Sequence, residues 1–437
     1  MKIPRRIAQT LMNALKGGVV PRVGLPHITV GRSAEIDALL HDVEIIAEGG
    51  ASFRFIVGKY GSGKSFLLQT IRNYVMAKNF VVMDADLSPE RRLQGTRGQG
   101  LATYKELIRN IATKTKPEGG ALSLILDRWI SNIQQEVVSE SNLSITDPAL
   151  APLVEKKISA VIGALNEMVH GFDFARLLTL YYRAYVNSDD LTKAKVLKWF
   201  RGEYVTKSEA KQELGVNIVI TDDDWYEYLK IFACFLKRAG YAGMLVLIDE
   251  LVNIYKIPNA ITRQYNYEKI LTMYNDTMQG KAQHFGIILC GTPQCMEDPR
   301  RGVYSYEALR SRLAEGHFAA EHKDLLSPVI RLQPLTHEEM LILVEKLADI
   351  HAGLYEYKQI VTQQDMVDFL QIEFGRIGAD IHITPREVIR DFIEVLDITY
   401  QNPSLSVTEL LGSDRFTYAQ NAVNEEATEA QFAEFEL

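Results

Sequence analysis

Residues 58–65 have the pattern G-x-x-x-x-G-K-S, which is typical of the phosphate-binding loop of nucleoside-triphosphatases. An aromatic and β-branched run at 53–57 precedes the loop, and a run with helical spacing at 66–71 follows it. Strand, glycine-rich loop and helix are therefore in the order that phosphate binding needs. The glycines let backbone N–H groups turn toward the phosphates, and the helix N-terminus favours an anion. The pattern predicts an α/β fold.

Each position of the loop has an expected role. Lys64 is expected to reach the β- and γ-phosphates, and Ser65 is expected to bind Mg²⁺. The alternative, a glycine-rich turn that matches by chance, is disfavoured by the second motif described next. The predicted nucleotide-binding positions of the loop are Gly58, Tyr60, Gly61, Ser62, Gly63, Lys64, Ser65 and Phe66.

A second motif lies at residues 244–250, where a continuous apolar run ends in Asp249 and Glu250. Such a run is typical of a parallel strand buried on both faces, and α/β sheets bind ligands at the carboxyl ends of such strands. Asp249 is expected to hold Mg²⁺, and Glu250 is expected to orient and polarise the attacking water. The alternative is a strand followed by an acidic helix cap. Two carboxylates in this place favour hydrolysis of the nucleotide over nucleotide sensing alone.

Further polar residues could complete a hydrolytic site. Thr292 follows a buried run at 285–291, where its hydroxyl could contact the attacking water. Arg310 and Arg312 are candidate arginine fingers for a neighbouring subunit, and Arg386 opens a late helix and could reach the phosphates from a lid. For each arginine the alternative is a solvated surface ion pair.

Ahead of the phosphate loop, Gly31 and Arg32 belong to a Val-Gly-Arg element that is expected to pack on the adenine. The alternative is a simple turn into a helix that runs through Ile46. The ligand expected at this site is a nucleoside triphosphate with Mg²⁺.

The order of the motifs predicts the domain organisation. The run at 81–86 is expected to be a strand that pairs near the phosphate-loop strand. Lys64 and Asp249 are too far apart for one βαβ unit, and the residues between them are mostly helix-compatible. The predicted parts are a basic N-terminal segment (1–27), a nucleotide-binding core (28–92 and 231–331), a helical insertion (93–230), a helical lid (332–402) and an acidic, partly mobile tail (403–437).

Composition narrows the possible partners and compartments. The net charge is −8 and the isoelectric point is about 5.7, so any contact with DNA must come from a local basic patch. Candidate patches are Arg91-Arg92, Arg97 and Arg300-Arg301, for which a structural or solvated role is the alternative. The three cysteines have no metal-ligand spacing with histidines, and no apolar run approaches a membrane span. We expect a protein of the reducing cytoplasm.

Together these motifs resemble those of the AAA+ and related ATPases of the origin-recognition and STAND type. Longer strings narrow the resemblance: residues 87–99, 199–203, 266–268 and 300–313 are similar to the BREX-type, BrxD-like ATP-binding family. The resemblance covers about 28–400. It implies an AAA+-like parallel-sheet core, ATP as the nucleotide and a role in bacterial defence against phages. The family's functional positions correspond to Lys64, Ser65, Asp249 and Glu250.

The sequence leaves several functions open. The first is an oligomeric ATPase that acts on or near double-stranded DNA in a BREX-like complex. The second is a nucleotide-gated scaffold with slow hydrolysis, which recruits a partner such as a helicase or methyltransferase. A STAND-type sensor is disfavoured because no repeat array is present, and a nucleotide kinase is disfavoured by the Asp-Glu strand.

Overall fold

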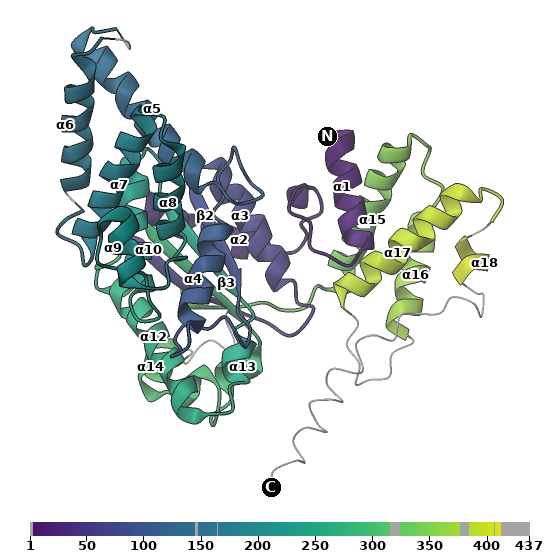
Figure 1. The fold of residues 1–437 in the computed structure, drawn as a ribbon. Coiled ribbons are helices and arrows are strands. Elements are labelled where there is room, and N and C mark those ends of the chain that lie inside the picture. The colour runs from purple at the N-terminus through teal and green to yellow at the C-terminus, as the bar shows by residue number, and fades with distance from the viewer. Residues whose placement is uncertain are drawn as a thin grey trace. The chain divides into compact units, whose positions relative to one another are not determined.

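The computed structural model describes residues 3–144, 147–163, 165–314, 324–375, 384–405 and 407–411. The chain forms two compact units, which we call the sheet unit and the lid unit (Figure 1). The sheet unit comprises Arg32–Lys59 and Leu67–Gln333, and the lid unit comprises Met1–Gly31, Tyr60–Phe66 and Pro334–Leu437. No helix in the described ranges is long and apolar enough to cross a membrane.

The sheet unit contains one five-stranded sheet, and all of its strand pairs are parallel. The strand order is β2-β3-β4-β1-β5. The strands are β1 (Ala51–Val57), β2 (Val81–Asp86), β3 (Met244–Asp249), β4 (Phe285–Gly291) and β5 (Val329–Arg331). The α/β fold class with a parallel sheet is thus confirmed, and the predicted strands at 53–57, 81–86, 244–249 and 285–291 are present.

One expectation about the sheet is wrong. The strand at 81–86 does not pair near the phosphate-loop strand, because β3 and β4 lie between β2 and β1. Instead β2 pairs with β3 along its whole length, from Val81 opposite Met244 to Asp86 opposite Asp249. Adjacency in the chain suggested that β1 and β2 would be neighbours, but β3 and β4, which come much later in the chain, take the central positions.

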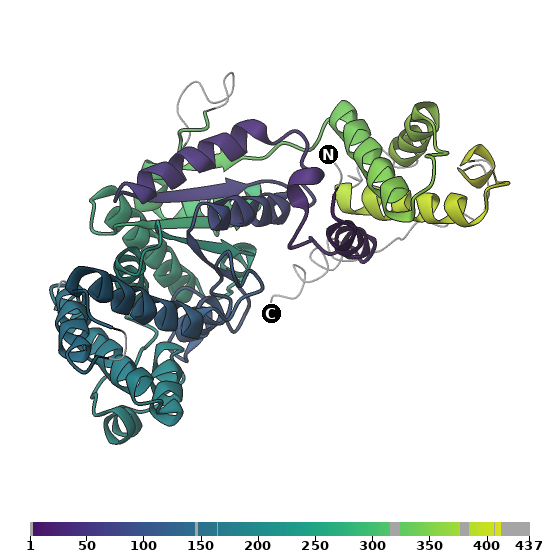
Figure 2. The same cartoon turned by 90° about the horizontal axis from the view of Figure 1, so that it is seen from above.

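Helices cover both faces of the sheet. On one face, alternate strand residues such as Ile56, Leu247 and Ile288 pack with α2 (Ser33–Ala47) and α3 (Lys64–Ala77). On the other face, Phe55, Val246 and their neighbours belong to the largest core cluster. Figure 2 shows α2 on one side of the strands and the blue-to-teal helices on the other. The strands are therefore buried on both faces, as their continuous apolar runs predict.

The long stretch between β2 and β3 is helical. Trp129, Trp199 and Trp225 from this stretch are buried in the core cluster that also covers the sheet. The insertion therefore shares a core with the sheet. Its helices are α4 (Gln99–Arg109), α5 (Leu122–Ser141), α6 (Leu150–Gly163), α7 (Gly171–Val186), α8 (Asp190–Phe200), α9 (Lys207–Leu214) and α10 (Trp225–Arg238).

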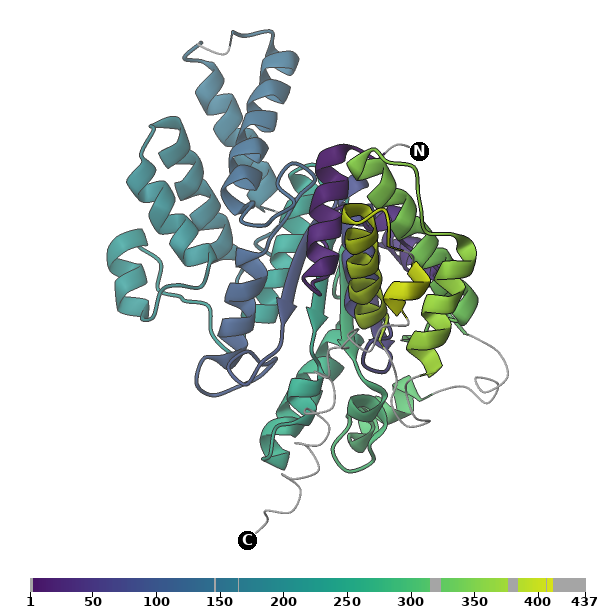
Figure 3. The same ribbon diagram turned by 90° about the vertical axis from the view of Figure 1, so that its right-hand side faces the viewer.

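Helices of different lengths follow the carboxyl ends of β3 and β4. In Figure 3 the strand arrowheads point toward this teal and green helical region. The helices here are α11 (Val252–Tyr255), α12 (Ala260–Met278), α13 (Pro293–Glu297), η2 (Val303–Ser305) and α14 (Glu307–Leu313).

The lid unit is helical and has its own apolar core. A capping box begins the helix at His337–Tyr355: Thr336 Oγ1 accepts a hydrogen bond from the Glu339 N–H, and the Glu339 carboxylate accepts one from the Thr336 N–H. The basic N-terminal segment packs into the same core through its first helix. The elements are α1 (Arg5–Lys16), η1 (Leu25–His27), α15 (His337–Tyr355), α16 (Gln363–Gly375), α17 (Pro385–Gln401) and α18 (Val407–Leu411).

Inside the lid unit, the buried ring of His351 links two helices. Its Nδ1 lies 2.8 Å from the Tyr357 hydroxyl, and its Nε2 lies 3.1 Å from a carboxylate oxygen of Asp397 on α17. Burial lowers the pKa of His351, and the hydrogen bond to Asp397 opposes that shift. The ring therefore favours its neutral form.

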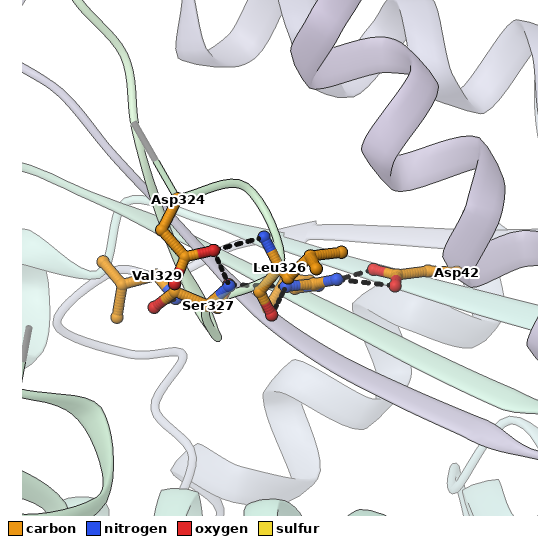
Figure 4. A network of polar contacts seen from close by, with 6 residues as sticks. Asp42, Asp324, Leu326, Ser327 and Val329 are labelled. Atoms are coloured by element: carbon orange, nitrogen blue, oxygen red, sulfur yellow. Dashed lines mark hydrogen bonds and ion pairs between the residues drawn. The ribbon is translucent and has the colours of Figure 1, made fainter. Parts of the chain in front are cut away.

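A buried ion pair fixes the edge of the sheet unit near β5. The guanidinium of Arg54 on β1 donates two hydrogen bonds to Asp42 on α2, at 2.6 and 2.7 Å. It also donates to the carbonyl oxygens of Leu326 and Ser327, which precede β5. Figure 4 shows Asp42 and the segment from Asp324 to Val329 in this network. Both side chains of the pair are less than a tenth exposed, at 9% for Arg54 and 8% for Asp42.

Breaking this pair is expected to destabilise the sheet unit strongly. Asp42→Ala leaves a buried guanidinium without its carboxylate and should lower the free energy of unfolding by about 3–5 kcal/mol. Urea unfolding followed by tryptophan fluorescence measures the effect, because all three tryptophans lie in the sheet unit. Arg109→Ala, which removes an exposed ion pair with Glu106, is the matched control and should cost less than about 1 kcal/mol. Equal small losses would contradict the role of the buried pair.

Candidate functional site

The phosphate loop has the local geometry that its glycines predict. It leaves β1 at Gly58, whose N–H donates to the carbonyl of Gly291 on the neighbouring strand β4, at 3.1 Å. Gly61 and Gly63 have φ angles of 76° and 85°, a region that glycine adopts without steric cost. Helix α3 then begins at Lys64. The backbone thus turns from a buried strand into a helix N-terminus, which is the arrangement that binds anions.

Residues Tyr60–Phe66 of the phosphate loop belong to the lid unit, as does the helix of Arg386. A Cβ atom at Gly61 would lie 2.6 Å from Cγ2 of Thr384, so no larger residue fits there. Thr384 caps α17 in a second capping box, and Arg386 lies in the first turn of that helix. Arg386 is exposed, and its guanidinium has no hydrogen bond or ion pair in the part of the chain that the structure describes. Its predicted reach toward the phosphates is compatible with this position.

The two carboxylates lie at the carboxyl end of β3, and the backbone at Glu250 is unusual. Glu250 has a φ of 60°, a left-handed conformation that few residues other than glycine adopt. Its N–H donates to Asp249 Oδ1 at 2.8 Å, and its carbonyl accepts from the N–H of Asn253 at 3.0 Å. The next residue, Leu251, is buried and donates its N–H to Cys290 on β4. These contacts hold a turn that leaves the Glu250 side chain exposed at the sheet edge.

Thr292 follows β4, the strand between β1 and β3. Its hydroxyl accepts a hydrogen bond from the N–H of Cys295 at 3.4 Å and caps α13. The hydroxyl proton remains able to donate. The sequence predicted only that Thr292 is a polar residue at the end of a strand. The structure adds the position of that strand, which lies between β1, the strand before the phosphate loop, and β3, the strand before the two carboxylates.

Sequence reasoning missed an acidic neighbour of Asp249. Asp86 ends β2 and lies opposite Asp249 in the strand register. Desolvation of its carboxyl raises the pKa of Asp86, and the charges of Asp249 and Asp84 raise it further. A polar residue at the end of a buried strand was the available signal, as it was for Asp249. The negative charge beside Asp249 suits a site that receives a cation.

The two candidate arginine fingers lie on the surface of α14. Arg310 forms an ion pair with Glu307, one turn earlier, at 2.6 Å. Arg312 donates to the carbonyl of Ala308 at 2.6 Å. Both arginines are exposed, and such local surface contacts contribute little to stability. Their side chains can therefore turn toward another molecule at low cost.

The Val-Gly-Arg element has contacts of a different kind. Gly31 has a φ of 65°, and a Cβ atom there would clash with the carboxylate of Glu339 on α15, which is also in the lid unit. Arg32 is buried, donates to the carbonyl of Gln333 at 2.6 Å and lies 3.8 Å from Glu35. These contacts connect the start of α2 to the last residue of the sheet unit. Packing of this element on adenine stays a prediction.

Other predicted binding positions lie on the loop itself. Tyr60 is 65% exposed and Ser62 is buried, while Phe66 packs against the core of the lid unit.

A parallel sheet with a phosphate loop after β1 and carboxylates after β3 defines a P-loop nucleoside-triphosphatase-like protein. The chain also matches the family described as BREX system ATP-binding protein BrxC/D over residues 3–415. Because the match covers nearly the whole chain, the chain belongs to this family of ATP-binding components of the BREX defence system. Comparison with curated proteins gives no match.

Proposed function

We propose that this protein hydrolyses ATP. The observation that carries the proposal is the sheet order, in which β1, β4 and β3 are neighbours. The phosphate loop, Thr292 and the Asp249-Glu250 pair follow the carboxyl ends of these three strands. Parallel α/β sheets place ligands at such ends, and this set provides phosphate binding, a polar hydroxyl and a general base.

Each side chain has a defined role in the proposed reaction. Lys64 and the loop N–H groups bind the phosphates, Glu250 accepts the proton of the attacking water, and the Thr292 hydroxyl positions that water. The residues present fit Mg²⁺, since Ser65 and Asp249 offer oxygen ligands and the carboxyl of Asp86 lies opposite Asp249. Bound Mg²⁺ would neutralise charge on the phosphates.

We also propose that hydrolysis depends on a homo-oligomer. Arg310 and Arg312 are exposed on α14 with only weak local contacts, so they are available to the ATP of a neighbouring subunit. Arg386, on the helix whose cap contacts the phosphate loop, would act within its own subunit. The developing charge on the transferred phosphoryl group is the target of both kinds of arginine.

In the BREX context, we propose that this ATPase acts on or near double-stranded DNA. A BREX system is a defence against phages, whose infecting genome is commonly duplex DNA, and an ATP-driven change of state is a means of responding to it. The family membership supports the ATP-binding part, and the DNA part is the subject of the further inference below.

A second candidate function is a nucleotide-gated scaffold with slow hydrolysis. The observation that favours it is the helical insertion, which exposes large apolar side chains at Phe172, Leu191 and Val205. Exposed apolar surface is typical of sites for other proteins. A helicase or methyltransferase of the same defence system would be the partner.

Loss of the phosphate-loop lysine tests the ATP site. Lys64→Ala should weaken ATP binding by about 10- to 100-fold, because it removes a charge-assisted hydrogen bond to phosphate. Isothermal titration with ATP measures the change. Lys78→Ala, just beyond the other end of the same helix and paired with Glu44 on the surface, is the control and should leave the affinity unchanged. Equal ATP affinity of wild type and Lys64→Ala would contradict the proposed site.

A further inference from the structure

Two loops at the carboxyl edge of the sheet carry a group of arginines. The first, residues 87–98, follows β2, and the second, residues 298–302, lies after β4 and α13. We call them the two arginine loops. Figure 1 shows α12 and α13 at this end of the sheet unit. Their arginines are Arg91, Arg92, Arg97, Arg300 and Arg301.

Among the described residues, four of these guanidinium groups form no ion pair with a carboxylate. They are the groups of Arg92, Arg97, Arg300 and Arg301. Arg301 stacks over the Tyr255 ring at 5.3 Å, and its charge helps to lower the pKa of the nearby Asp298. The Nε atoms of Arg92 and Arg301 are also shielded from water without a hydrogen-bond acceptor. Half-buried charges without partners cost free energy. An anionic ligand would relieve this cost in both loops at once.

The carboxylates beside the loops bind backbone groups instead. Asp298 accepts hydrogen bonds from the N–H groups of Arg300 and Arg301, at 2.8 and 3.0 Å. These bonds to the Arg300 and Arg301 N–H groups lower the pKa of Asp298. Asp222 accepts from the N–H groups of Gly98 and Leu101, both at 2.7 Å. The acids thus fix the shape of the loops and leave the guanidinium groups available.

One helical segment holds both loops in place. Asn266 on α12 accepts hydrogen bonds from the N–H groups of Leu93 and Gln94, at 3.0 Å each. The next residue, Tyr267, donates its hydroxyl proton to the Arg301 carbonyl. Consecutive residues of one helix therefore fix one loop each, so the two loops form a single surface.

The short helix α11 connects this surface to Glu250. The side chain of Asn253 on α11 donates to the Leu87 carbonyl at 2.9 Å, and its N–H donates to the Glu250 carbonyl at 3.0 Å. The Tyr255 hydroxyl donates to Asp298 at 3.1 Å. An anion bound to the two loops would therefore act, through these hydrogen bonds, on the turn that holds Glu250.

We propose that the two arginine loops bind the phosphate backbone of double-stranded DNA, and that this contact is sensed at Glu250. The proposal deepens the proposed function and rests on it for the link to hydrolysis. Guanidinium groups bind phosphate in a bidentate manner, and several of them on one surface match the repeated phosphates of a duplex. Neither loop carries an aromatic side chain, so the stacking that single strands need is not provided by the loops.

Fluorescence anisotropy of a labelled duplex, with the full-length protein and a series of salt concentrations, tests the proposal. Arg92→Gln/Arg301→Gln should weaken binding at least about tenfold and reduce the slope of log K against log salt by about two, one for each lost phosphate contact. Arg97→Gln/Arg300→Gln, which changes exposed side chains only, should have a similar effect. Arg109→Gln and Arg183→Gln remove exposed arginines that are paired with carboxylates and should leave binding unchanged.

Thermal unfolding separates binding from structural roles. Replacing unpaired, half-buried charges should not lower the melting temperature, whereas loss of a structural arginine would. Unchanged DNA affinity in both double variants overturns the proposal, as does equal affinity of the wild type for a single strand of the same length. Wild-type protein that hydrolyses ATP without binding duplex DNA also overturns it and leaves the proposed function standing. Duplex binding without ATP hydrolysis would contradict the proposed function but would support the two arginine loops as a DNA-binding surface.

Discussion

The double variant Arg310→Ala/Arg312→Ala is expected to hydrolyse ATP about 1,000-fold more slowly than the wild type, since arginine fingers contribute about 10³–10⁵ to turnover. ATP affinity should stay within about threefold, because neither side chain belongs to the phosphate loop. Steady-state phosphate release and ATP titration measure the two quantities. The single variants identify which arginine is the finger, and the ion pair of Arg310 with Glu307 makes Arg312 the less restrained of the two.

Two controls make this result specific. Ser311→Ala changes the residue between the two arginines, whose exposed hydroxyl donates to the Ala308 carbonyl of the same helix, and should leave turnover unchanged. Mixing the double arginine variant with Glu250→Gln subunits should restore turnover, because one subunit supplies the finger and the other supplies the general base. Wild-type turnover in the double variant would defeat the finger in trans, and so would a failure of mixed subunits to regain activity.

Glu250→Gln is expected to reduce turnover by about 10²–10⁴, the contribution typical of a positioned general base. The amide keeps the size of the side chain, so the left-handed turn and its contacts to Asp249, Asn253 and β4 should persist. ATP should therefore still bind, and the variant should hold ATP without releasing phosphate.

Glu268→Gln on α12 is the matched control for Glu250→Gln, because it makes the same chemical change in the sheet unit at a residue that has no role in the proposed reaction. It should hydrolyse ATP at the wild-type rate. If Glu250→Gln also hydrolyses ATP at the wild-type rate, another group activates the water and the assignment of Glu250 fails.

The sequence predicted those parts of the fold that are encoded locally. The apolar runs that become β1 to β4 and the phosphate loop each lie within a few residues. Strand order is a different kind of information, because it depends on contacts between distant segments. The expected neighbour of β1 was therefore wrong, and β5, with only Val329–Arg331, was too short to be recognised from its pattern.

The features of the candidate site also fall into two groups, those that the sequence predicted and those that only the structure shows. Chain motifs were sufficient to nominate Lys64, Asp249 and Glu250, and the family match confirms ATP binding. Three-dimensional contacts were needed for the remainder. The left-handed backbone of Glu250 and the pairing of Asp86 with Asp249 follow from packing at the sheet edge. No periodicity in the sequence encodes these features.

The arginines of the two loops show a further limit of prediction from the sequence alone. From sequence, Arg92 and Arg301 could not be told from ordinary surface arginines, for which a carboxylate partner is the default expectation. Only the structure shows that the nearby acids Asp222 and Asp298 bind backbone N–H groups. A chain with a net charge of −8 can therefore still carry a basic patch, because the acidic side chains near the patch bind backbone N–H groups and, among the described residues, form no ion pairs with the arginines.

Steady-state phosphate release by the purified wild-type protein, with Mg²⁺ and ATP and with or without long double-stranded DNA, tests the central claim most directly. We expect turnover above that of Glu250→Gln, loss of turnover when Mg²⁺ is chelated, and a higher rate when DNA is present. Phosphate release at the level of Glu250→Gln in both conditions, with ATP bound, would contradict an ATPase and favour the nucleotide-gated scaffold.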